Sequence, residues 1–168
     1  MSRGTLRRSA VAVRSAHGIV LLALLITLML VGVLALAATE VWATAVQRER
    51  EVELLFAGDQ YLAAIRSYYY AAPRGQARVL PSSLDDLLND QRSAVPVQHL
   101  RRLFRDPMSE SEEWGFVQRG NGIAGVYSQS DRKPIKQSGF DAAHAAFEGK
   151  EAYRDWAFVF VPPAARRR

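Results

Sequence analysis

An uninterrupted apolar stretch from Gly18 to Thr39 is the feature that most constrains this chain. It contains no charged side chain, and its only polar side chains belong to Thr27 and Thr39. As a helix it would be about 33 Å long, enough to cross a hydrocarbon core of about 30 Å. Because a helix satisfies its own backbone polar groups, lipid can surround it, whereas a small soluble domain could hardly cover it on all sides. The sequence therefore predicts a membrane span.

Charge is distributed unequally around this stretch. Much of the formal charge of +5 comes from arginines that precede the span and from three more at the C-terminus, and the rest of the chain is close to neutral. A near-neutral domain argues against a nucleic-acid groove, which needs clustered positive charge. A basic segment before the span, with mixed charges after it, predicts a cytoplasmic N-terminus and a domain across the inner membrane, in the periplasm. The basic residues before the span are Arg3, Arg7, Arg8 and Arg14.

The basic leader and apolar stretch have two general interpretations. One is a cleaved secretory signal peptide, with Ala35-Leu36-Ala37 as the small-x-small cleavage site. The apolar run from Ile19 to Leu34 is longer than the usual core of about 7–15 residues, which weakens that interpretation. The other is a permanent anchor that is never cut. The chain has no cysteine, so neither a disulfide framework nor a lipid-modified cysteine is available to it.

A third interpretation rests on a resemblance. A short basic leader ends in Gly18, and the apolar run begins at Ile19. This arrangement resembles the N-terminus of type IV pilins and type II secretion pseudopilins, in which a prepilin peptidase cuts after the glycine and the new N-terminus is methylated. The chain departs from the family pattern in two places: it has Ile19 where Phe is usual, and Ala23 where the fifth mature residue is usually Glu.

The resemblance implies a function without catalysis. A pilin-like subunit would leave the membrane by packing its apolar helix against those of other pilin-like subunits. Its partners would be these subunits, an inner-membrane assembly platform, the prepilin peptidase and membrane lipid, with no nucleic acid. The residues expected on the assembly helix are Leu21, Leu24, Leu25 and Leu28.

A second helical pattern continues beyond the span. From Glu40 to Tyr70 there is no proline, and apolar residues recur mostly at spacings of three and four, which predicts a half-buried helix. Together the two segments predict one rod from about Ile19 to Tyr70. The apolar positions are Val52, Leu55, Phe56, Tyr61, Leu62, Ile65, Tyr68 and Tyr69. The polar positions between them, expected on the wet face, are Arg48, Glu49, Arg50, Glu51, Glu53, Asp59 and Arg66.

Proline, glycine and helix-capping residues divide the rest of the chain into segments. Ala72-Pro73-Arg74-Gly75 should end the rod. A short helix should start after Leu80-Pro81, with Ser82 or Ser83 as its cap and Asp85 or Asp86 three residues later, and reach about Asp90. The segment 92–105 reads as a basic connector, and Asp106-Pro107 as a turn before the strands. The leucine-proline helix and the Asp-Pro turn also resemble the corresponding segments of major pseudopilins.

Three apolar runs then predict a small antiparallel sheet, and so an α+β fold. The expected strands are 113–117, 123–128 and 155–161, with a hairpin turn at 119–122 and a helical piece near 141–147. The expected organisation is a basic leader at 1–18, a transmembrane half of the long helix at 19–39, its amphipathic half at 40–72, and a small globular part at 73–168.

Residues with catalytic or ligand chemistry are sparse. His17, His99 and His144 are scattered, and only His144 has a carboxylate nearby in sequence, at Asp141. An enzyme would need a cleft with an acid–base pair, for example one lined by Asp106, His99 and Glu112. We predict no catalytic, cofactor or metal residues. Some major pseudopilins hold calcium in a loop beside the sheet; the oxygen ligands available for such a site here would be Glu110, Glu112, Glu113 and Asp131.

Overall fold

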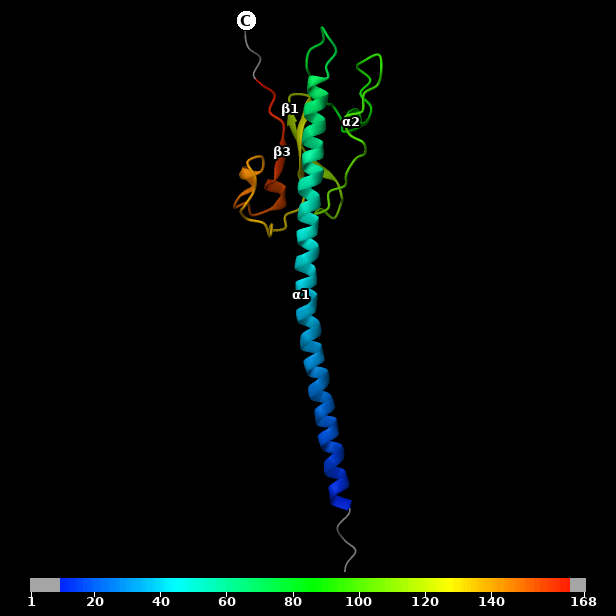
Figure 1. Cartoon of the computed structure of the whole chain (residues 1–168), viewed down its shortest axis with the longest axis vertical. Coiled ribbons are helices and arrows are strands. Elements are labelled where there is room, and N and C mark those ends of the chain that lie inside the picture. Colours follow the sequence, from blue (N-terminus) through cyan, green and yellow to red (C-terminus); the bar gives the residue numbers. More distant parts are fainter. Residues whose placement is uncertain (1–9, 164–168) are drawn as a thin grey trace, which may run out of the picture. The chain divides into compact units, whose positions relative to one another are not determined.

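The protein is α+β in this computed structural model, as the sequence predicts: a long N-terminal helix and a small three-stranded antiparallel sheet (Figure 1). The structure describes residues 10–163, with side chains at 18–35 and 42–163. The leader and C-terminal arginines lie outside the residues whose side chains are described. So do Leu36 and Ala37 of the alternative signal-peptidase site.

Helix α1 spans Ala10–Tyr70. The predicted rod is thus present, but it begins before Ile19, and part of the leader is helical. Contacts within the chain divide it into two units, with the boundary after Ala45. In the first unit the described part is helix alone; in the second, α1 from Val46 onward packs with all the elements that follow.

The buried stripe of α1 explains how the second unit is built. Its members recur every three residues or as adjacent pairs, a pattern that repeats with the helical period and places them on one helix face. Leu54, Tyr61 and Ile65 on this face are completely buried. The other members of the stripe are Ala57, Gly58, Ala64 and Tyr68.

This stripe corrects three positions on the predicted helix faces. Val52 and Phe56, expected on the apolar face, are 68% and 55% exposed. Glu51, expected on the wet face, is only 4% exposed. The reason is helical phase: Glu51 lies three residues before Leu54 and seven before Gly58, so it falls on the buried face, whereas Val52 and Phe56 lie beside it. Of the tyrosines at the helix end, Tyr68 is buried, Tyr69 is half-buried and Tyr70 is exposed.

The sheet has the order β1-β2-β3, with both pairs antiparallel. Strand β1 spans Trp114–Arg119 and β2 spans Gly122–Ser128, joined by a two-residue turn. Gly120 has a φ of +60°, which suits glycine at the first position of a hairpin turn and confirms the predicted turn. The sheet lies along the C-terminal part of α1 (Figure 1).

Strand β3, Ala157–Val159, is shorter than the run predicted at 155–161. Its beginning is displaced by a 3₁₀ turn, η2, at Tyr153–Asp155. After the end of β3, Phe160 still donates its N–H to the Ala124 carbonyl of β2. In the neighbouring β1–β2 pair, the register shifts between Val117 and Gln118. The regular ladder therefore stops before the prolines, which have no N–H to donate.

The connecting segments contain little regular structure. Helix α2 is a single turn, Asp85–Leu88, and stops short of the predicted end because Asp90 forms a β-bridge with Val97. In the first turn of α2, Asp86 accepts hydrogen bonds from Ser82 and from the Ser83 N–H, which confirms the predicted serine–aspartate start signal. The helical piece expected near 141–147 is a 3₁₀ turn, η1, at Ala145–Phe147.

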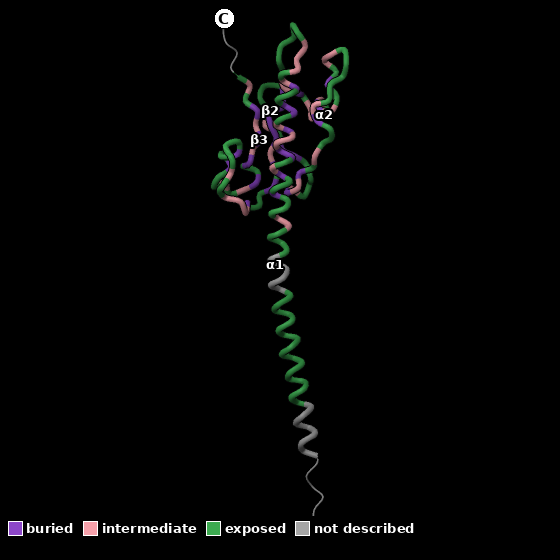
Figure 2. Tube along the Cα trace, viewed as in Figure 1, coloured by how far each residue is buried: buried purple, intermediate pink, exposed green. Residues whose placement is uncertain are grey.

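Aromatic side chains fill the space between α1 and the sheet, where the buried residues gather (Figure 2). Trp156 is completely buried and stacks on Phe147, with ring centroids 5.4 Å apart. Phe158 contacts Phe147 and Trp114 edge to face. Edge-to-face and offset pairs add about 1 kcal/mol each to the free energy of area burial.

Replacing Gly58 by alanine should destabilise the domain, although alanine is the better helix former. A Cβ at Gly58 would lie 2.4 Å from the ring of Phe158, which is only 2% exposed and cannot swing away. We expect a loss of about 1–3 kcal/mol in the free energy of unfolding, measured by urea denaturation. The double variant Gly58→Ala, Phe158→Leu is the control, because the smaller side chain should recover part of the loss. An increase in stability for Gly58→Ala alone would contradict this packing.

Candidate functional site

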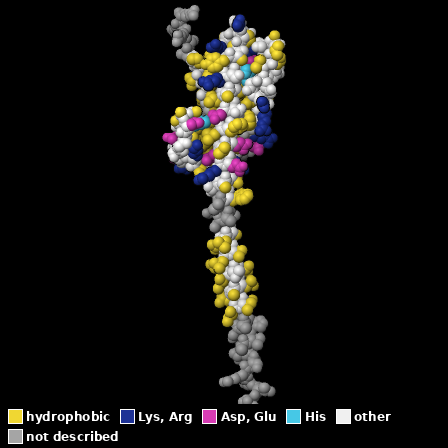
Figure 3. Space-filling view, in the orientation of Figure 1, with side chains coloured by type: hydrophobic (Ala, Val, Ile, Leu, Met, Phe, Trp, Pro, Cys, Tyr) yellow, Lys and Arg dark blue, Asp and Glu magenta, His cyan; other side chains and the backbone are white. Residues whose placement is uncertain are grey.

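The surface of the first unit is a continuous apolar helix. From Gly18 to Ala35 the mean hydropathy is 2.9, and none of these residues is buried within the chain. Figure 3 shows hydrophobic side chains along this segment without an acidic or basic one among them. By length and composition this helix can cross a membrane once, and a signal sequence has the same properties. Single-pass anchoring is compatible with it.

All four leucines expected on the assembly helix are exposed. Leu21, Leu24, Leu25 and Leu28 are between 53% and 64% exposed. Their spacing of three, one and three residues places them together on one helix face. The one polar side chain in the segment, Thr27, donates its hydroxyl to the Ala23 carbonyl at 2.8 Å, so it leaves no donor unsatisfied in an apolar environment.

The expected processing bond, Gly18–Ile19, lies inside α1 and not at its beginning. Gly18 is exposed with nothing within 4 Å of its Cβ position, and Ile19 is 68% exposed. A peptidase that binds its substrate in an extended form would have to unwind the helix here. Glycine lowers the cost, since it is about 1 kcal/mol less favourable than alanine in a helix interior.

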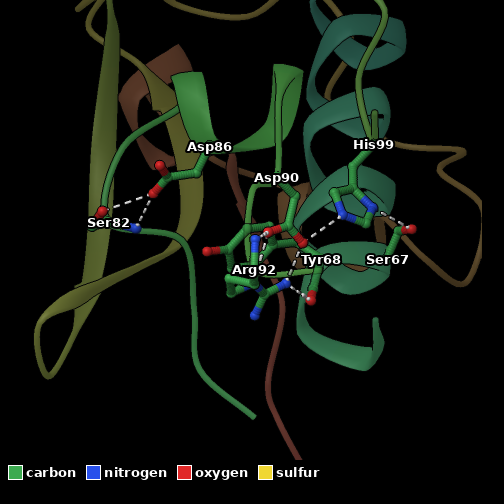
Figure 4. A network of polar contacts seen from close by, with 7 residues as sticks. All are labelled: Ser67, Tyr68, Ser82, Asp86, Asp90, Arg92 and His99. Atoms are coloured by element: carbon green, nitrogen blue, oxygen red, sulfur yellow. Dashed lines mark hydrogen bonds and ion pairs between the residues drawn. The ribbon is translucent and has the colours of Figure 1, made fainter. Parts of the chain in front are cut away.

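A polar network closes the C-terminal end of α1 (Figure 4). At its centre is Asp90, 2% exposed, which accepts hydrogen bonds from the Arg92 backbone and guanidinium at 2.7–3.0 Å. The same guanidinium donates to the Tyr68 carbonyl at 2.7 Å and lies 3.5 Å from the centre of the Tyr68 ring. It therefore supplies a donor to one of the carbonyls that a helix end leaves without a partner, and a positive charge at the negative end of the helix dipole.

The electrostatics of Asp90 follow from this contact. Hydrogen bonds from Arg92 hold the pKa of the Asp90 carboxyl well below its usual range, although burial acts in the opposite direction. For Tyr68, burial is the larger effect and raises the pKa of its phenol, while the charge of Arg92 lowers it. The network therefore keeps a carboxylate charged in the interior by pairing it.

The same network also places a serine, a histidine and an aspartate in a row of contacts, the residue types of a serine hydrolase triad. Ser67 Oγ lies 2.8 Å from His99 Nδ1, and His99 Nε2 lies 3.3 Å from Asp90 Oδ2. The surroundings favour a structural role. Asp90 is already paired with Arg92, the His99 side chain is 1% exposed, and Ser67 does not line the cleft to which His99 contributes.

A second buried carboxylate attaches the segment between β2 and β3 to α1. Glu51 accepts the N–H groups of Ile135 and Lys136 at 2.6 and 3.2 Å and the Tyr153 hydroxyl at 2.7 Å. Burial raises the pKa of Tyr153 to about 12, and its hydrogen bond to Glu51 acts in the same direction. Sequence reasoning missed this role because it assigned Glu51 to the wet face.

The acid–base cleft that an enzyme would need is not assembled from the three residues considered above. Asp106 is 1% exposed and accepts hydrogen bonds from the Met108 N–H, the Ser128 hydroxyl and the Gln129 N–H. Glu112 is exposed and pairs with Arg105 at 2.6 Å. His99 lines a cleft of about 710 Å³ beside Phe56, to which neither Asp106 nor Glu112 contributes.

The oxygen ligands considered for calcium also have other partners or lie apart. Glu112 pairs with Arg105, and Asp131 pairs with Arg154. Among the described residues, no group of three or more His, Cys, Asp or Glu side chains is arranged to hold a metal ion. His144, by contrast, does contact carboxylates: Asp141, its neighbour in sequence, and Asp59 of α1.

Comparison with known proteins identifies no family for this chain. No family model matches it, and neither a curated protein nor a solved structure is similar to it. What can be argued about function therefore rests on the exposed apolar helix and on the contacts of the second unit.

Replacing Asp90 by asparagine should cost stability in a pH-dependent way. The change leaves the Arg92 guanidinium without its carboxylate, at a cost of about 3 kcal/mol in the free energy of unfolding at pH 7. Because the folded-state pKa of Asp90 is lowered, its contribution is complete above the ordinary aspartate value of about 3.9 and disappears as the pH falls. The difference between wild type and variant should therefore shrink from pH 5 to pH 2.

The matched control is Asp85→Asn, at an exposed position of α2, five residues before Asp90. It should change stability by less than about 0.5 kcal/mol at any pH in this range. If Asp90→Asn were equally harmless at pH 7, the network would not hold the end of α1.

Proposed function

We propose that this chain is a non-enzymatic, pilin-like subunit of a type II secretion pseudopilus or a type IV pilus. It resides in the inner membrane as a single-pass protein, with its N-terminus in the cytoplasm and its domain in the periplasm. A prepilin peptidase cuts the Gly18–Ile19 bond, and the mature protein co-assembles with pilin-like subunits through its N-terminal helix. Its role is in protein transport or pilus formation.

The observation that carries the proposal is the segment Gly18–Ala35, which is helical, strongly apolar and not buried by any part of its own chain. Such a surface cannot remain in water; it needs lipid or another apolar surface. Copies of the same helix can supply that surface when a subunit leaves the bilayer. Membrane and filament core then act as two interchangeable apolar environments.

The plan of the second unit supports the same proposal. The C-terminal part of α1, packed on a small antiparallel sheet, gives each subunit a compact head. Apolar side chains that this packing leaves exposed are available to neighbouring subunits. Val52 and Phe56 are exposed apolar side chains on the α1 segment of this unit. The polar networks at Asp90 and Glu51 attach loops to the helix, so their residues already have structural tasks.

Two other roles fit the same apolar helix. A membrane-anchored binding or sensor domain would keep the leader, and a secreted domain would lose the whole span after Ala37. The three roles differ in the N-terminus of the mature protein, which makes that terminus the decisive observation.

Mass spectrometry of the protein purified from its native membrane should find Ile19 as the N-terminal residue, with or without a methyl group. The reason is position: Gly18 lies at the end of a basic leader, at the cytoplasmic edge of the span, within reach of a peptidase that acts from that side. An N-terminus at Ala38 would identify an exported soluble domain, and one at Met1 or Ser2 a fixed anchor. Either would overturn the proposal.

A variant pair tests the enzyme responsible. Gly18→Leu should leave the full-length precursor in the membrane, because a bulky residue at the cut site blocks the peptidase. Gly32→Leu, at an equally open glycine of the same helix, should be processed normally. Normal processing of Gly18→Leu would show that another protease makes the cut.

A further inference from the structure

His144 occupies an unusual position between two carboxylates. Its Nε2 lies 2.9 Å from Asp59 Oδ1 on α1, and its Nδ1 lies 2.8 Å from Asp141 Oδ1 on its own segment. The residue is only 8% exposed, and its ring packs against those of Phe147 and Phe158. It thus joins the segment between β2 and β3 to α1.

Both ring nitrogens of His144 face a carboxylate oxygen, and this determines how many N–H groups the ring must carry. A neutral imidazole has one N–H donor and one acceptor nitrogen. Its acceptor nitrogen would face a carboxylate oxygen, which is also an acceptor, and the two lone pairs would repel each other. An ionised carboxylate has no proton to offer in return. Only the imidazolium form, with two N–H groups, can make both contacts. The bridge therefore requires a charged His144.

The surroundings give the two carboxylates no other cation. Within the part of the chain whose side chains are described, neither Asp59 nor Asp141 forms an ion pair with a lysine or arginine. The groups that face the ring are Asp59 from α1, Asp141 from its own segment, and the uncharged rings of Phe147 and of Phe158 from β3. A neutral ring would leave one contact broken and two negative charges unbalanced.

His99 provides a contrast inside the same molecule. One of its nitrogens faces Asp90, but the other faces the Ser67 hydroxyl, which can donate as well as accept. A neutral His99 can therefore satisfy both contacts, with its N–H toward Asp90 and the serine O–H toward its other nitrogen. Loss of a proton breaks nothing there. The two histidines differ in the partner of one nitrogen.

We propose that His144 is a proton-dependent latch that holds the segment 141–150 against α1 while both ring nitrogens are protonated, and releases it when the ring loses one of these protons as the pH rises. The sign follows from the bridge: its stabilisation needs the proton, so it is present at low pH and lost at higher pH. Release would uncover Phe147, now 4% exposed, together with the aromatic surface beneath it. The docking of this segment then depends on the acidity of the compartment that the domain faces.

Hydrogen exchange of the full-length protein in dodecyl maltoside micelles tests the latch. Amide exchange in peptides covering 141–150 is measured at pH 5.5 and pH 8.0 and corrected for the chemical exchange rate at each pH. We expect opening to increase about two- to fivefold at pH 8.0 in the wild type, the size appropriate to contacts with half-exposed carboxylates. The increase should be absent in His144→Gln, which cannot change its charge.

Asp59→Asn is the second variant, and it decides the matter should His144→Gln not fold. With a neutral amide facing Nε2, a neutral ring can satisfy both contacts, so the pH dependence in 141–150 should fall toward onefold. Peptides around His99 serve as the internal control and should show no pH-dependent difference between wild type and variants. Equal opening of 141–150 at both pH values in the wild type, or an unchanged pH dependence in either folded variant, would overturn the latch.

Discussion

Burial of one face of α1 against the sheet is the interaction on which the second unit depends. Leu54, Tyr61 and Ile65 are completely buried. They belong to the same core as the sheet residues Trp114 and Phe158. A three-stranded sheet with β3 only three residues long could not bury its own apolar face. The helix supplies the missing layer, so the sheet and α1 form one core.

The connecting segments are attached to that helix by polar contacts. The Tyr61 hydroxyl both donates to the Phe104 carbonyl and accepts from the Phe104 N–H, each at 2.9 Å, and burial raises the pKa of this phenol. Glu51, Asp59 and the Tyr68 carbonyl bind other segments in the same manner. Segments with little regular structure are thereby positioned, because their backbone and side-chain donors find acceptors on a rigid rod.

Much of the fold could be predicted from the sequence because its signals are local. Charge-free length predicts the apolar helix. The Gly120-Asn121-Gly122 run predicts the hairpin turn, because glycine and asparagine accept a positive φ, and Gly120 adopts one. The errors in assigning residues to the faces of α1 come from the helical phase, which local patterns do not fix without knowledge of long-range contacts. The apolar pattern of α1 could be shifted by one position, and this placed Val52 inside and Glu51 outside. A closer count of spacings from Leu54 through Tyr68 could have corrected it.

The polar sites were less accessible to sequence reasoning. Asp90 and His99 are separated by nine residues and meet only because a β-bridge reverses the chain between them. Asp59 and His144 are 85 residues apart and meet through the packing of the core. Such pairs have no local signature, whereas the serine–aspartate start signal before α2 was recognisable because its partners are close in sequence.

The central claim is that the apolar helix is covered by other helices of the same kind, and cysteine cross-linking in cells tests it most directly. The natural chain has no cysteine, so single and paired cysteines at Leu21, Leu24, Leu25 and Leu28 report only on the introduced positions. A disulfide requires Cα atoms within about 7 Å, which only laterally packed helices provide. The account predicts a ladder of cross-linked species under assembly conditions. Monomers alone at every position, with the protein still in the membrane, would contradict it.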